Sequence, residues 1–457
     1  MPVTDHVLAT LAAALPHGSL LTDQDLLPAY SQDWARDPAA VLPRAVVRAT
    51  CTEDVQAVMR WATEHRVPVI PRGAGSGLSG GATAVADSIV ISTERMRRVE
   101  VDPVTRIAVV EPGLLNAEVK AAAAEHGLWY PPDPSSFEMC SIGGNIATNA
   151  GGLCCVKYGV TTDYVLALEV VLADGTAVRL GGPRLKDVAG LSLTKLFVGS
   201  EGTLGVITEA TLRLIPAQPP SSTLVATFAS VQAAADTVAA ITRTLRPSML
   251  EFMDRTSIGA VEDALKMGLD RDAEAMLIAR SDASGAVAAE EISVMADACT
   301  AHGAVETFST DDPEEGEAFV AARRYAIPAV ERLGTLLLED VGVPLPKLPE
   351  LVAGIAALSR EHDVLVAVIA HAGDGNTHPL IVFDPEDAAM AERAHRVFGE
   401  IMDLAIALGG TITGEHGVGR LKKAWLPAQV GPDVMELTRR VKTALDPLGI
   451  LNPGAIL

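Results

Sequence analysis

Cysteine is scarce in this chain and is not spaced for a disulfide framework or a thiolate metal site. The 457 residues include Cys51, Cys140, Cys154, Cys155 and Cys299. Their number is odd and no CxxC occurs. This argues against a secreted fold stabilised by disulfides, against a cysteine-ligated zinc site and against an iron–sulfur cluster. The adjacent Cys154 and Cys155 are expected to be small residues in a glycine-rich region.

Long hydrophobic runs and a basic N-terminus are also absent. No segment approaches the ~20 consecutive apolar residues of a membrane-spanning helix. The opening MPVTDHVLATLAAALPHG holds no Lys or Arg and so lacks the basic start of a signal peptide. We therefore expect a soluble, cytoplasmic protein with no transmembrane segment.

Basic residues are outnumbered, since 36 Lys and Arg face 58 Asp and Glu and give a formal net charge of −22. Such a chain repels nucleic acid and anionic lipid surfaces, so no nucleic-acid partner is expected. An anionic substrate would need local cationic groups or a metal to overcome this field. Any Arg or Lys in a cleft is therefore more significant than usual.

Apolar residues, by contrast, make up 49% of the chain, enough for roughly two or three domains with their own cores. Up to about residue 217, β-branched runs such as RAVVRA (44–49) and SIVIS (88–92) alternate with helical stretches such as TEDVQAVMRWATEHR (52–66). The proline cluster PAQPPSS (216–222) breaks this alternation, and a second α/β series follows it. The pattern predicts an α+β protein with a domain boundary near residue 217.

The stretch HAGDGNTH, at 371–378, follows the apolar run VLVAVIA. Gly373 and Gly375 disfavour a helix, and the pattern predicts a buried strand that turns into a tight loop. Such a loop can bring His371 and His378 together, as a divalent metal requires of neutral imidazole ligands. The alternative is a polar hairpin whose histidines bond to nearby backbone. A third ligand elsewhere would decide between them.

Three glycine-rich turns occur in the first half. PRGAGSGLSGGA (71–82) follows a strand-like run and has the character of a pyrophosphate cradle, although it lacks the dinucleotide fingerprint and could be a flexible turn. PPDPSSFEMCSIGGNIATNAGG (131–152) and VGSEGTLGVITEATL (198–212) add two more. Together they indicate a long, bent ligand that lies along the backbone.

These segments, in this order and with LNPGAIL at 451–457, resemble the FAD-dependent oxidases and dehydrogenases of the vanillyl-alcohol oxidase type. The resemblance covers nearly the whole chain. It implies a two-part FAD-binding domain at 1–217 and an α/β cap domain for substrate at 218–410. Residues 411–457 would complete the FAD site and the active site.

The same resemblance implies which residues bind FAD. The diphosphate would lie on Pro71, Arg72, Gly73, Ala74, Gly75, Ser76 and Gly77. The isoalloxazine and ribityl would lie along Pro132, Asp133, Ser135, Ser136, Gly143, Gly144 and Asn145, and the adenine side along Gly202, Gly205, Ile207 and Asn452. Several relatives attach the flavin through a His in the diphosphate loop. Residues 71–82 contain no His, so we expect non-covalent FAD.

TITGEHGVGRLKK (411–423) offers a third metal ligand. Glu415 can complete a His2Glu set with His371 and His378, which leaves an open position for substrate, as in catalytic zinc sites. The alternative for Glu415 is a surface carboxylate paired with Lys422 or Lys423. Zinc is the expected ion, with manganese or iron as close alternatives.

HAGDGNTH and TITGEHGVGRLKK together resemble the 2-hydroxy-acid branch of the family, the D-lactate, glycolate and D-2-hydroxyglutarate dehydrogenases. This resemblance implies that the substrate chelates the metal and that His416 takes the hydroxyl proton while the C2 hydride passes to flavin N5. A competing assignment makes His416 a metal ligand and Glu415 a bystander. The electrons would leave for a quinone, a cytochrome or an electron-transfer flavoprotein.

FVAARRYAIPAVERLG (319–334) is similar to the segment where relatives place an arginine that binds the substrate carboxylate. Arg323 is our choice and Arg324 the alternative, because a guanidinium fork can hold a carboxylate with two bonds. Both could instead be surface residues of an amphipathic helix. Asn376 could bond the substrate or a ligand carboxylate, or form an Asx turn.

Two departures from the family pattern limit the substrate. Relatives that act on 2-hydroxyglutarate carry a Lys in the strand after that Arg and an Asn two residues after the second metal His. Leu338 and Leu380 stand at these places. A second carboxylate would lose its partners, which favours D-lactate, glycolate or a longer apolar 2-hydroxy acid.

Two other functions compete with this one. The first is a metal-independent FAD oxidase of an alcohol or aldehyde, and the second is a flavin-binding subunit of a larger electron-transfer complex. The oligomeric state is left open, with a homodimer as one expectation.

Overall fold

The computed structural model describes residues 5–35 and 37–457. Residues 1–4 and 36 lie outside the described residues, including the first part of the stretch from which the absence of a signal peptide is predicted. The chain forms two compact units. The described residues of the first unit lie within Met1–Gly151, Val160–Ala217 and Glu415–Leu457, and the second unit is Gly152–Gly159 and Gln218–Gly414.

A small sheet of order β1-β2-β4-β3 carries the N-terminal part of the first unit. Its strands are β1 (Leu20–Leu21), β2 (Ala45–Arg48), β4 (Ile89–Ser92) and β3 (Val69–Arg72), and β2, β4 and β3 run parallel. Helix α2 (Thr52–His65) connects β2 to β3 and packs with α1 (Asp5–Ala14). The predicted strands and helix of this region are confirmed.

The end of the chain belongs to this same sheet. Val69 of β3 accepts a backbone hydrogen bond from Asn452 (2.8 Å) and donates one to Ile450 (2.8 Å). Ile450 and Leu451 are buried in the core that β2, β3 and β4 share with α2. LNPGAIL is therefore an integral part of the first unit.

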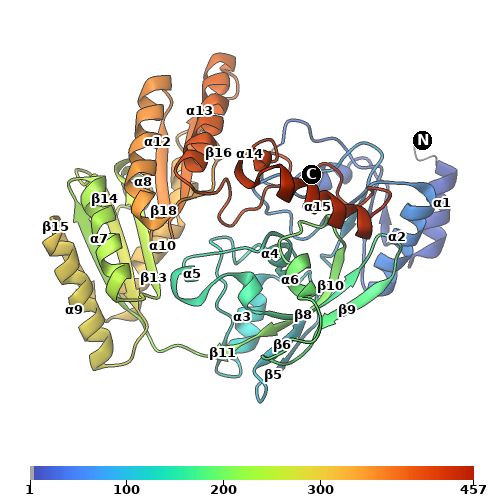
Figure 1. Ribbon diagram of the computed structural model, residues 1–457, viewed down its shortest axis with the longest axis horizontal. Helices are drawn as coiled ribbons and strands as arrows, with labels where there is room; N and C mark the ends of the chain where they lie inside the picture. The colour runs from blue at the N-terminus through green and yellow to red at the C-terminus, as the bar shows by residue number, and fades with distance from the viewer. Residues whose placement is uncertain (1–4, 36) are drawn as a thin grey trace. The chain divides into compact units, whose positions relative to one another are not determined.

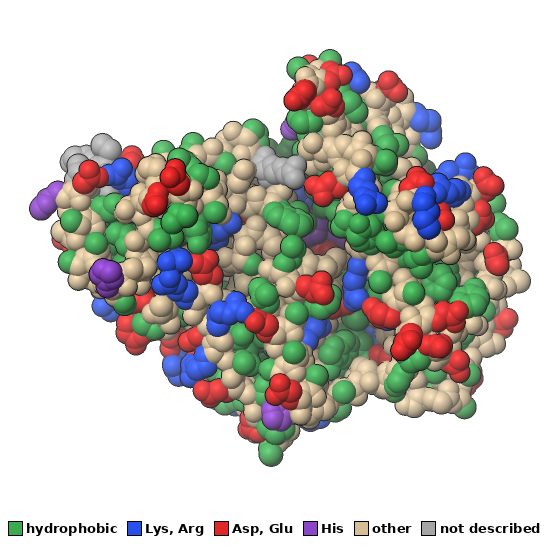
Figure 2. Space-filling view, turned by 180° about the vertical axis from the view of Figure 1, so that it is seen from behind, with side chains coloured by type: hydrophobic (Ala, Val, Ile, Leu, Met, Phe, Trp, Pro, Cys, Tyr) green, Lys and Arg blue, Asp and Glu red, His purple; other side chains and the backbone are tan. Residues whose placement is uncertain are grey.

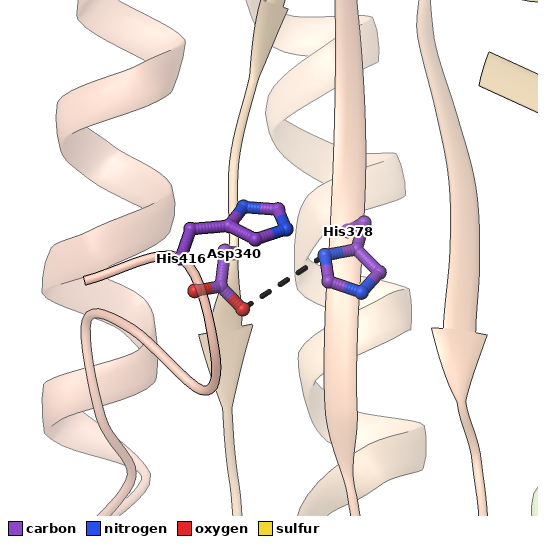
Figure 3. A group of neighbouring side chains, drawn as sticks. All are labelled: Asp340, His378 and His416. Atoms are coloured by element: carbon purple, nitrogen blue, oxygen red, sulfur yellow. Dashed lines mark ion pairs between the residues drawn. The ribbon is translucent and has the colours of Figure 1, made fainter. Parts of the chain in front are cut away.

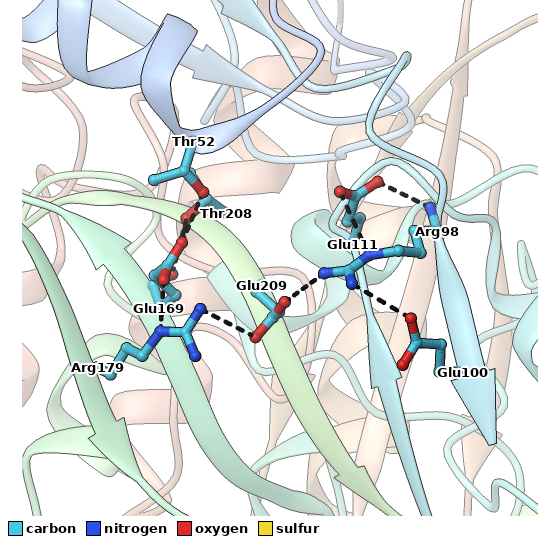
Figure 4. Close-up of polar contacts among 8 residues, drawn as sticks. All are labelled: Thr52, Arg98, Glu100, Glu111, Glu169, Arg179, Thr208 and Glu209. Atoms are coloured by element: carbon cyan, nitrogen blue, oxygen red, sulfur yellow. Dashed lines mark hydrogen bonds and ion pairs between the residues drawn. The ribbon is translucent and has the colours of Figure 1, made fainter. Parts of the chain in front are cut away.

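An antiparallel sheet of order β5-β6-β10-β8-β9 completes the first unit. Two arginines bridge carboxylates across it (Figure 4): Arg98 lies 2.6 Å from Glu209, and Arg179 lies 2.7 Å from Glu169. Burial raises the pKa of Glu169, but hydrogen bonds from Thr52 and Arg179 more than offset this and lower it. Exposed ion pairs of this kind contribute only about 0.2–1 kcal/mol each to the free energy of unfolding, so this network adds little to the stability of the sheet. The strands are β5 (Val99–Asp102), β6 (Ile107–Val110), β10 (Val206–Arg213), β8 (Val165–Val171) and β9 (Ala177–Gly181).

Shorter elements surround these sheets. They are η1 (Leu27–Tyr30), α3 (Asn116–Ala124), β7 (Leu128–Trp129), α4 (Ile142–Thr148), η2 (Thr161–Asp163), α6 (Leu193–Phe197), β11 (Ile215–Pro216), α14 (Leu426–Val430) and α15 (Pro432–Leu445). Acidic and basic side chains are interspersed over the face of the molecule shown in Figure 2.

The second unit is built on one antiparallel sheet of order β15-β12-β14-β13-β18-β19-β16, with β17 also paired to β19. All residues of β18 and β19 are buried, so both faces of the sheet are covered there. The strands are β12 (Ser222–Phe228), β13 (Met249–Asp254), β14 (Ala275–Ser281), β15 (Ala304–Thr310), β16 (Thr335–Leu338), β17 (Val341–Gly342), β18 (Val366–His371) and β19 (Asn376–Phe383).

Two groups of helices cover this sheet. Helices α9, α7, α12 and α13 contact one another in a row (Figure 1), while α8, α10 and α11 form a second group that shares a core with the opposite face of β13, β18 and β19. No helix among the described residues combines the length and hydropathy needed to cross a bilayer. The helices are α7 (Val231–Thr244), α8 (Arg255–Leu265), α9 (Ala286–Ala301), α10 (Pro313–Arg324), α11 (Ala326–Glu331), α12 (Leu348–His362) and α13 (Ala388–Ala407), with η3 (Leu345–Lys347).

The unit boundaries differ from the predicted domain limits in two places. Residues 152–159, which include α5 (Cys155–Tyr158), belong to the second unit because Leu153 is buried in its core and Lys157 pairs with Asp282. The second unit also ends at Gly414 rather than 410, because Thr411 exchanges two backbone hydrogen bonds with Gly342 (2.8 and 3.0 Å). The proline cluster at 216–222 is visible in the sequence, whereas these tertiary contacts cannot be read from it.

The turn between β18 and β19 generates a stability prediction. Gly375 has a φ of +84°, and a Cβ there would lie 2.2 Å from the carbonyl oxygen of Val343. We expect Gly375→Ala to lower the free energy of unfolding by on the order of 1–3 kcal/mol or more, measured by urea denaturation. Gly409→Ala is the matched control, since its φ is +76° but no atom lies within 4 Å of its added Cβ. Equal unfolding midpoints for the two variants would contradict the close contact.

Candidate flavin site and metal centre

The glycine-rich turns of the first unit meet one another and the C-terminal segment. The backbone N–H of Ala74 donates to Ser141 Oγ (3.1 Å), which joins the 71–82 loop to the second turn. Asn452 Nδ2 donates to the carbonyl oxygens of Gly81 and Glu201 (both 2.7 Å), which joins the first and third turns. The three predicted FAD segments and Asn452 are therefore brought together in one unit.

The first loop has the backbone that a diphosphate requires. In the part of the chain that the structure describes, the N–H groups of Gly73, Gly75, Ser76 and Gly77 donate to no protein acceptor. These residues are half-buried rather than fully solvated. Clustered backbone N–H groups of this kind form an anion-binding concavity, so the loop fits the diphosphate of FAD.

Other predicted FAD residues have structural partners of their own. The Arg72 guanidinium donates to the carbonyl oxygens of Gln32 (2.8 Å) and Ala29 (3.1 Å). Arg72 therefore links the start of the 71–82 loop to the backbone at 29–32. Asn116 Nδ2 donates to Pro132 O (3.2 Å) and to Asn145 Oδ1 (3.1 Å), which links the beginning of the second segment to helix α4.

The remaining members differ in exposure and in packing. Asp133 is buried, Ser136 is half-buried and Ser135 is exposed. Gly143 and Gly144 lie in the first turn of α4. A Cβ at Gly205, just before β10 and Ile207, would lie 2.4 Å from Val170, and one at Gly202 would lie 2.9 Å from Pro71. These two glycines are thus required by packing as well as being predicted cofactor contacts.

Glu201 fixes the turn that follows His416. Its two carboxylate oxygens accept hydrogen bonds from the backbone N–H groups of Val418 (2.7 Å) and Gly419 (2.8 Å), and Ser79 Oγ donates to the carbonyl oxygen of His416 (3.0 Å). Burial raises the pKa of Glu201 to about 7, against the effect of these two bonds. The sequence prediction assigned no role to Glu201 beyond its place in the third glycine-rich turn.

This raised pKa predicts a pH dependence of stability. Between the ordinary value of 4.5 and about 7, the folded protein keeps a proton on Glu201 that the unfolded chain has lost. The free energy of unfolding should therefore fall as pH rises through this window and level off above it. Glu201→Gln cannot titrate, so its thermal unfolding midpoint should fall less over the same pH range. Identical slopes for parent and variant would show that Glu201 is not protonated in this way.

The HAGDGNTH stretch is a β-hairpin that brings its two histidines together. His371 ends β18 opposite Asn376, and His378 of β19 stands opposite Ile369. Because side chains alternate along a strand, both histidines lie on the face that carries Ile369. Their ring centroids are 5.1 Å apart at an interplanar angle of 85°. The prediction of a strand that turns into a tight loop with converging imidazoles is confirmed.

A buried carboxylate supports the first of these histidines. His371 Nδ1 lies 2.8 Å and 3.0 Å from the two oxygens of Glu251 on β13, and Arg323 Nη2 of α10 lies 2.8 Å from Glu251 Oε2. An ionised carboxylate only accepts hydrogen bonds, so Nδ1 carries the proton and Nε2 keeps its lone pair. Arg323 thus has an internal anionic partner, whereas Arg324 pairs with Glu317 (3.0 Å) and is more exposed.

A second buried carboxylate accompanies His378. Nδ1 of His378 lies 3.8 Å from Oδ1 of Asp340, the ion pair drawn in Figure 3. The other oxygen of Asp340 accepts hydrogen bonds from Thr413 Oγ1 (2.6 Å) and from the N–H of Gly414 (3.0 Å). Asp340 therefore fixes the last residues of the second unit, directly before Glu415 in the chain.

Within the second unit, His371 and His378 thus lie together, each near a buried carboxylate. Imidazole nitrogen and carboxylate oxygen are the donors that suit zinc. Glu415 and His416 belong to the first unit, directly after Gly414 in the chain. The predicted set of His371, His378 and Glu415 therefore stays a prediction, as does the competing assignment of His416 as a ligand.

Asn376 does not form the Asx turn considered for it. The N–H of Asn376 instead donates to the side chain of Asp374 (3.2 Å). Its own amide packs on Gly414, where a Cβ would lie 2.3 Å from Asn376 Oδ1. Asn376 therefore packs against the segment that leads to Glu415.

Sequence reasoning missed Glu251 and Asp340. Both left a weak signal, since each is a carboxylate in an apolar context: MLEFMD (249–254) and the LED that follows TLL in 335–340. A buried acidic residue has to be paired, but only the tertiary structure identifies its partner.

Two protein families and several curated relatives match this chain. The family described as "FAD binding domain" matches residues 43–181, and that described as "FAD linked oxidases, C-terminal domain" matches 218–456. The chain is 39% identical to the glycolate oxidase subunit GlcD of Bacillus subtilis, over 96% of this chain and 92% of that one. It is 35% identical to the D-lactate dehydrogenase of Archaeoglobus fulgidus, over 94% and 96%.

Solved structures share the fold at low sequence identity. The 4-ethylphenol oxidase from Gulosibacter chungangensis has a TM-score of 0.82 at 19% identity, over 99% of this chain and 97% of that one. The p-cresol methylhydroxylase has a TM-score of 0.82 at 18% identity, over 99% and 98%. The chain therefore has the two-domain FAD-binding fold of these structures, which confirms the predicted α+β class.

The chain belongs to the FAD-linked oxidases and is an FAD-linked oxidoreductase related to the glycolate oxidase subunit GlcD and to D-lactate dehydrogenases. The FAD cofactor and the enzyme class predicted from the sequence are confirmed.

Proposed function

We propose that this chain is an FAD- and divalent-metal-dependent dehydrogenase that converts a D-2-hydroxy acid of the D-lactate or glycolate type into the 2-oxo acid. One observation carries the proposal: His371 and His378 converge on the buried hairpin, each beside a carboxylate. The names of the relatives, glycolate oxidase subunit GlcD and D-lactate dehydrogenase, support the same substrate class.

In this proposal His371, His378 and Glu415 hold the metal, with zinc preferred over manganese or iron. A bound divalent cation lowers the pKa of a substrate hydroxyl and anchors the neighbouring carboxylate. His416 accepts the hydroxyl proton on a ring nitrogen as general base. Arg323 rather than Arg324 is the partner proposed for the substrate carboxylate, because Arg323 lies beside Glu251, the carboxylate that contacts His371, whereas Arg324 pairs with Glu317 and is more exposed.

The glycine-rich loops of the first unit hold FAD without a covalent bond in this proposal. A bound FAD would supply the hydride acceptor, and a quinone, a cytochrome or an electron-transfer flavoprotein would be the onward electron acceptor. The amides of Gly73, Gly75, Ser76 and Gly77, which have no protein acceptor in the described chain, bind the diphosphate.

The preference for a monocarboxylate is supported by two leucines. Leu338 of β16 and Leu380 of β19 stand directly opposite each other. Leu380 lies two residues after His378 and so shares its face of the sheet. Neither side chain can pair with a second carboxylate, so a substrate with an apolar or short side chain is favoured over 2-hydroxyglutarate.

Anaerobic mixing tests this function directly. The purified yellow protein should bleach with D-lactate or glycolate and far more slowly with D-2-hydroxyglutarate, followed by flavin absorbance in a stopped-flow instrument. Acid precipitation of the same sample should release the flavin into the supernatant. Failure of every 2-hydroxy acid, together with bleaching by a simple alcohol or aldehyde in chelator-treated protein, would favour the metal-independent oxidase instead.

Two alanine variants separate the roles of Glu415 and His416. We expect Glu415→Ala to lose metal, and His416→Ala to keep FAD and metal but to reduce its flavin on the order of 10²- to 10⁴-fold more slowly. Metal content is measured by elemental analysis and the rate by stopped-flow absorbance. Metal loss in His416→Ala with retention in Glu415→Ala would instead make His416 the metal ligand and Glu415 the bystander.

A further inference from the structure

We propose that Glu251 is a positioning residue of the metal centre, whose carboxylate orients the imidazole of His371 while Arg323 fixes that carboxylate. This inference rests on the proposed function in one respect, namely that His371 is a metal ligand. It adds a residue on a third strand to the site and gives Arg323 a role through Glu251.

Strand register places Glu251 beside His371. In the antiparallel pair of β13 and β18, Phe252 stands opposite Ala370 and Met253 opposite Ile369. The next position along this register sets Glu251 opposite His371. Since Met253 and Ile369 belong to the core shared with α10, Glu251 and His371 also face α10, which carries Arg323.

The hydrogen-bond geometry orients the ring. Both oxygens of Glu251 lie within 3.0 Å of Nδ1 of His371, so the N–H of the imidazole is directed at the carboxylate. This fixes the tautomer and aims Nε2 away from β13 with its lone pair available. A carboxylate behind a ligating imidazole also increases its basicity, and its removal weakens metal binding by about 10- to 100-fold.

Arg323 keeps the carboxylate in place. The Glu251 side chain is 1% exposed and that of Arg323 is 2% exposed, so each ion has lost its water. A buried anion needs an oppositely charged partner, and the guanidinium of Arg323 supplies that charge, with Nη2 2.8 Å from Oε2. If Glu251 served only to pair β13 with α10 through Arg323, its loss would not change the metal affinity of His371. If Glu251 also orients His371, its loss should weaken metal binding.

The test is zinc affinity rather than turnover. The flavin-loaded protein is stripped of metal and titrated with zinc against a chromophoric chelator. Glu251→Gln, which keeps the shape but not the charge, should bind zinc about 10- to 100-fold more weakly than the parent. Glu317→Gln is the matched control, because Glu317 also pairs with arginines, Arg280 and Arg324 (both 3.0 Å), but on the surface. Its zinc affinity should equal that of the parent.

The outcomes separate this inference from the proposed function. A parent that binds no zinc, or a His371→Ala variant that binds it normally, would overturn the metal site itself. A parent that loses zinc on His371→Ala but not on Glu251→Gln would overturn only the role of Glu251. If Glu251→Gln fails to fold, the double variant Glu251→Met with Arg323→Met removes both charges at similar volume, and normal zinc affinity in it would equally refute the proposal.

Discussion

The antiparallel hairpin of β18 and β19 is the constraint on which the candidate metal centre depends. Its register determines that His371 and His378, seven residues apart in the chain, share one face of the sheet and stand diagonally across neighbouring strands. A shift of one residue would turn one imidazole to the other face. The tight turn keeps this register, because Gly375 passes against the backbone of Val343 where no side chain fits.

Buried carboxylates set the orientation of neighbouring groups within each unit. Glu251 faces His371, Asp340 faces His378 and holds the backbone at Gly414, and in the first unit Glu201 holds the turn after His416. In a chain of net charge −22 these acidic groups are buried only because each meets a donor or a cation. Each carboxylate therefore fixes a neighbouring group in place.

Local patterns in the sequence predict much of this arrangement. The strand-like runs at 44–49 and 88–92, the helix at 52–66 and the hairpin at 371–378 form as expected, because periodicity and glycine placement determine them locally. The attachment of residues 152–159 to the second unit is not predictable in this way. Glu251 and Asp340 are equally hidden, since their partners lie on other strands and only sheet register brings them together.

Anomalous X-ray diffraction tests the central claim most directly. Crystals of the zinc-loaded protein, measured on both sides of the zinc absorption edge, should show a peak about 2.0–2.1 Å from Nε2 of His371 and from a ring nitrogen of His378. Zinc-containing crystals whose peak lies away from both histidines would contradict a metal centre built on this hairpin.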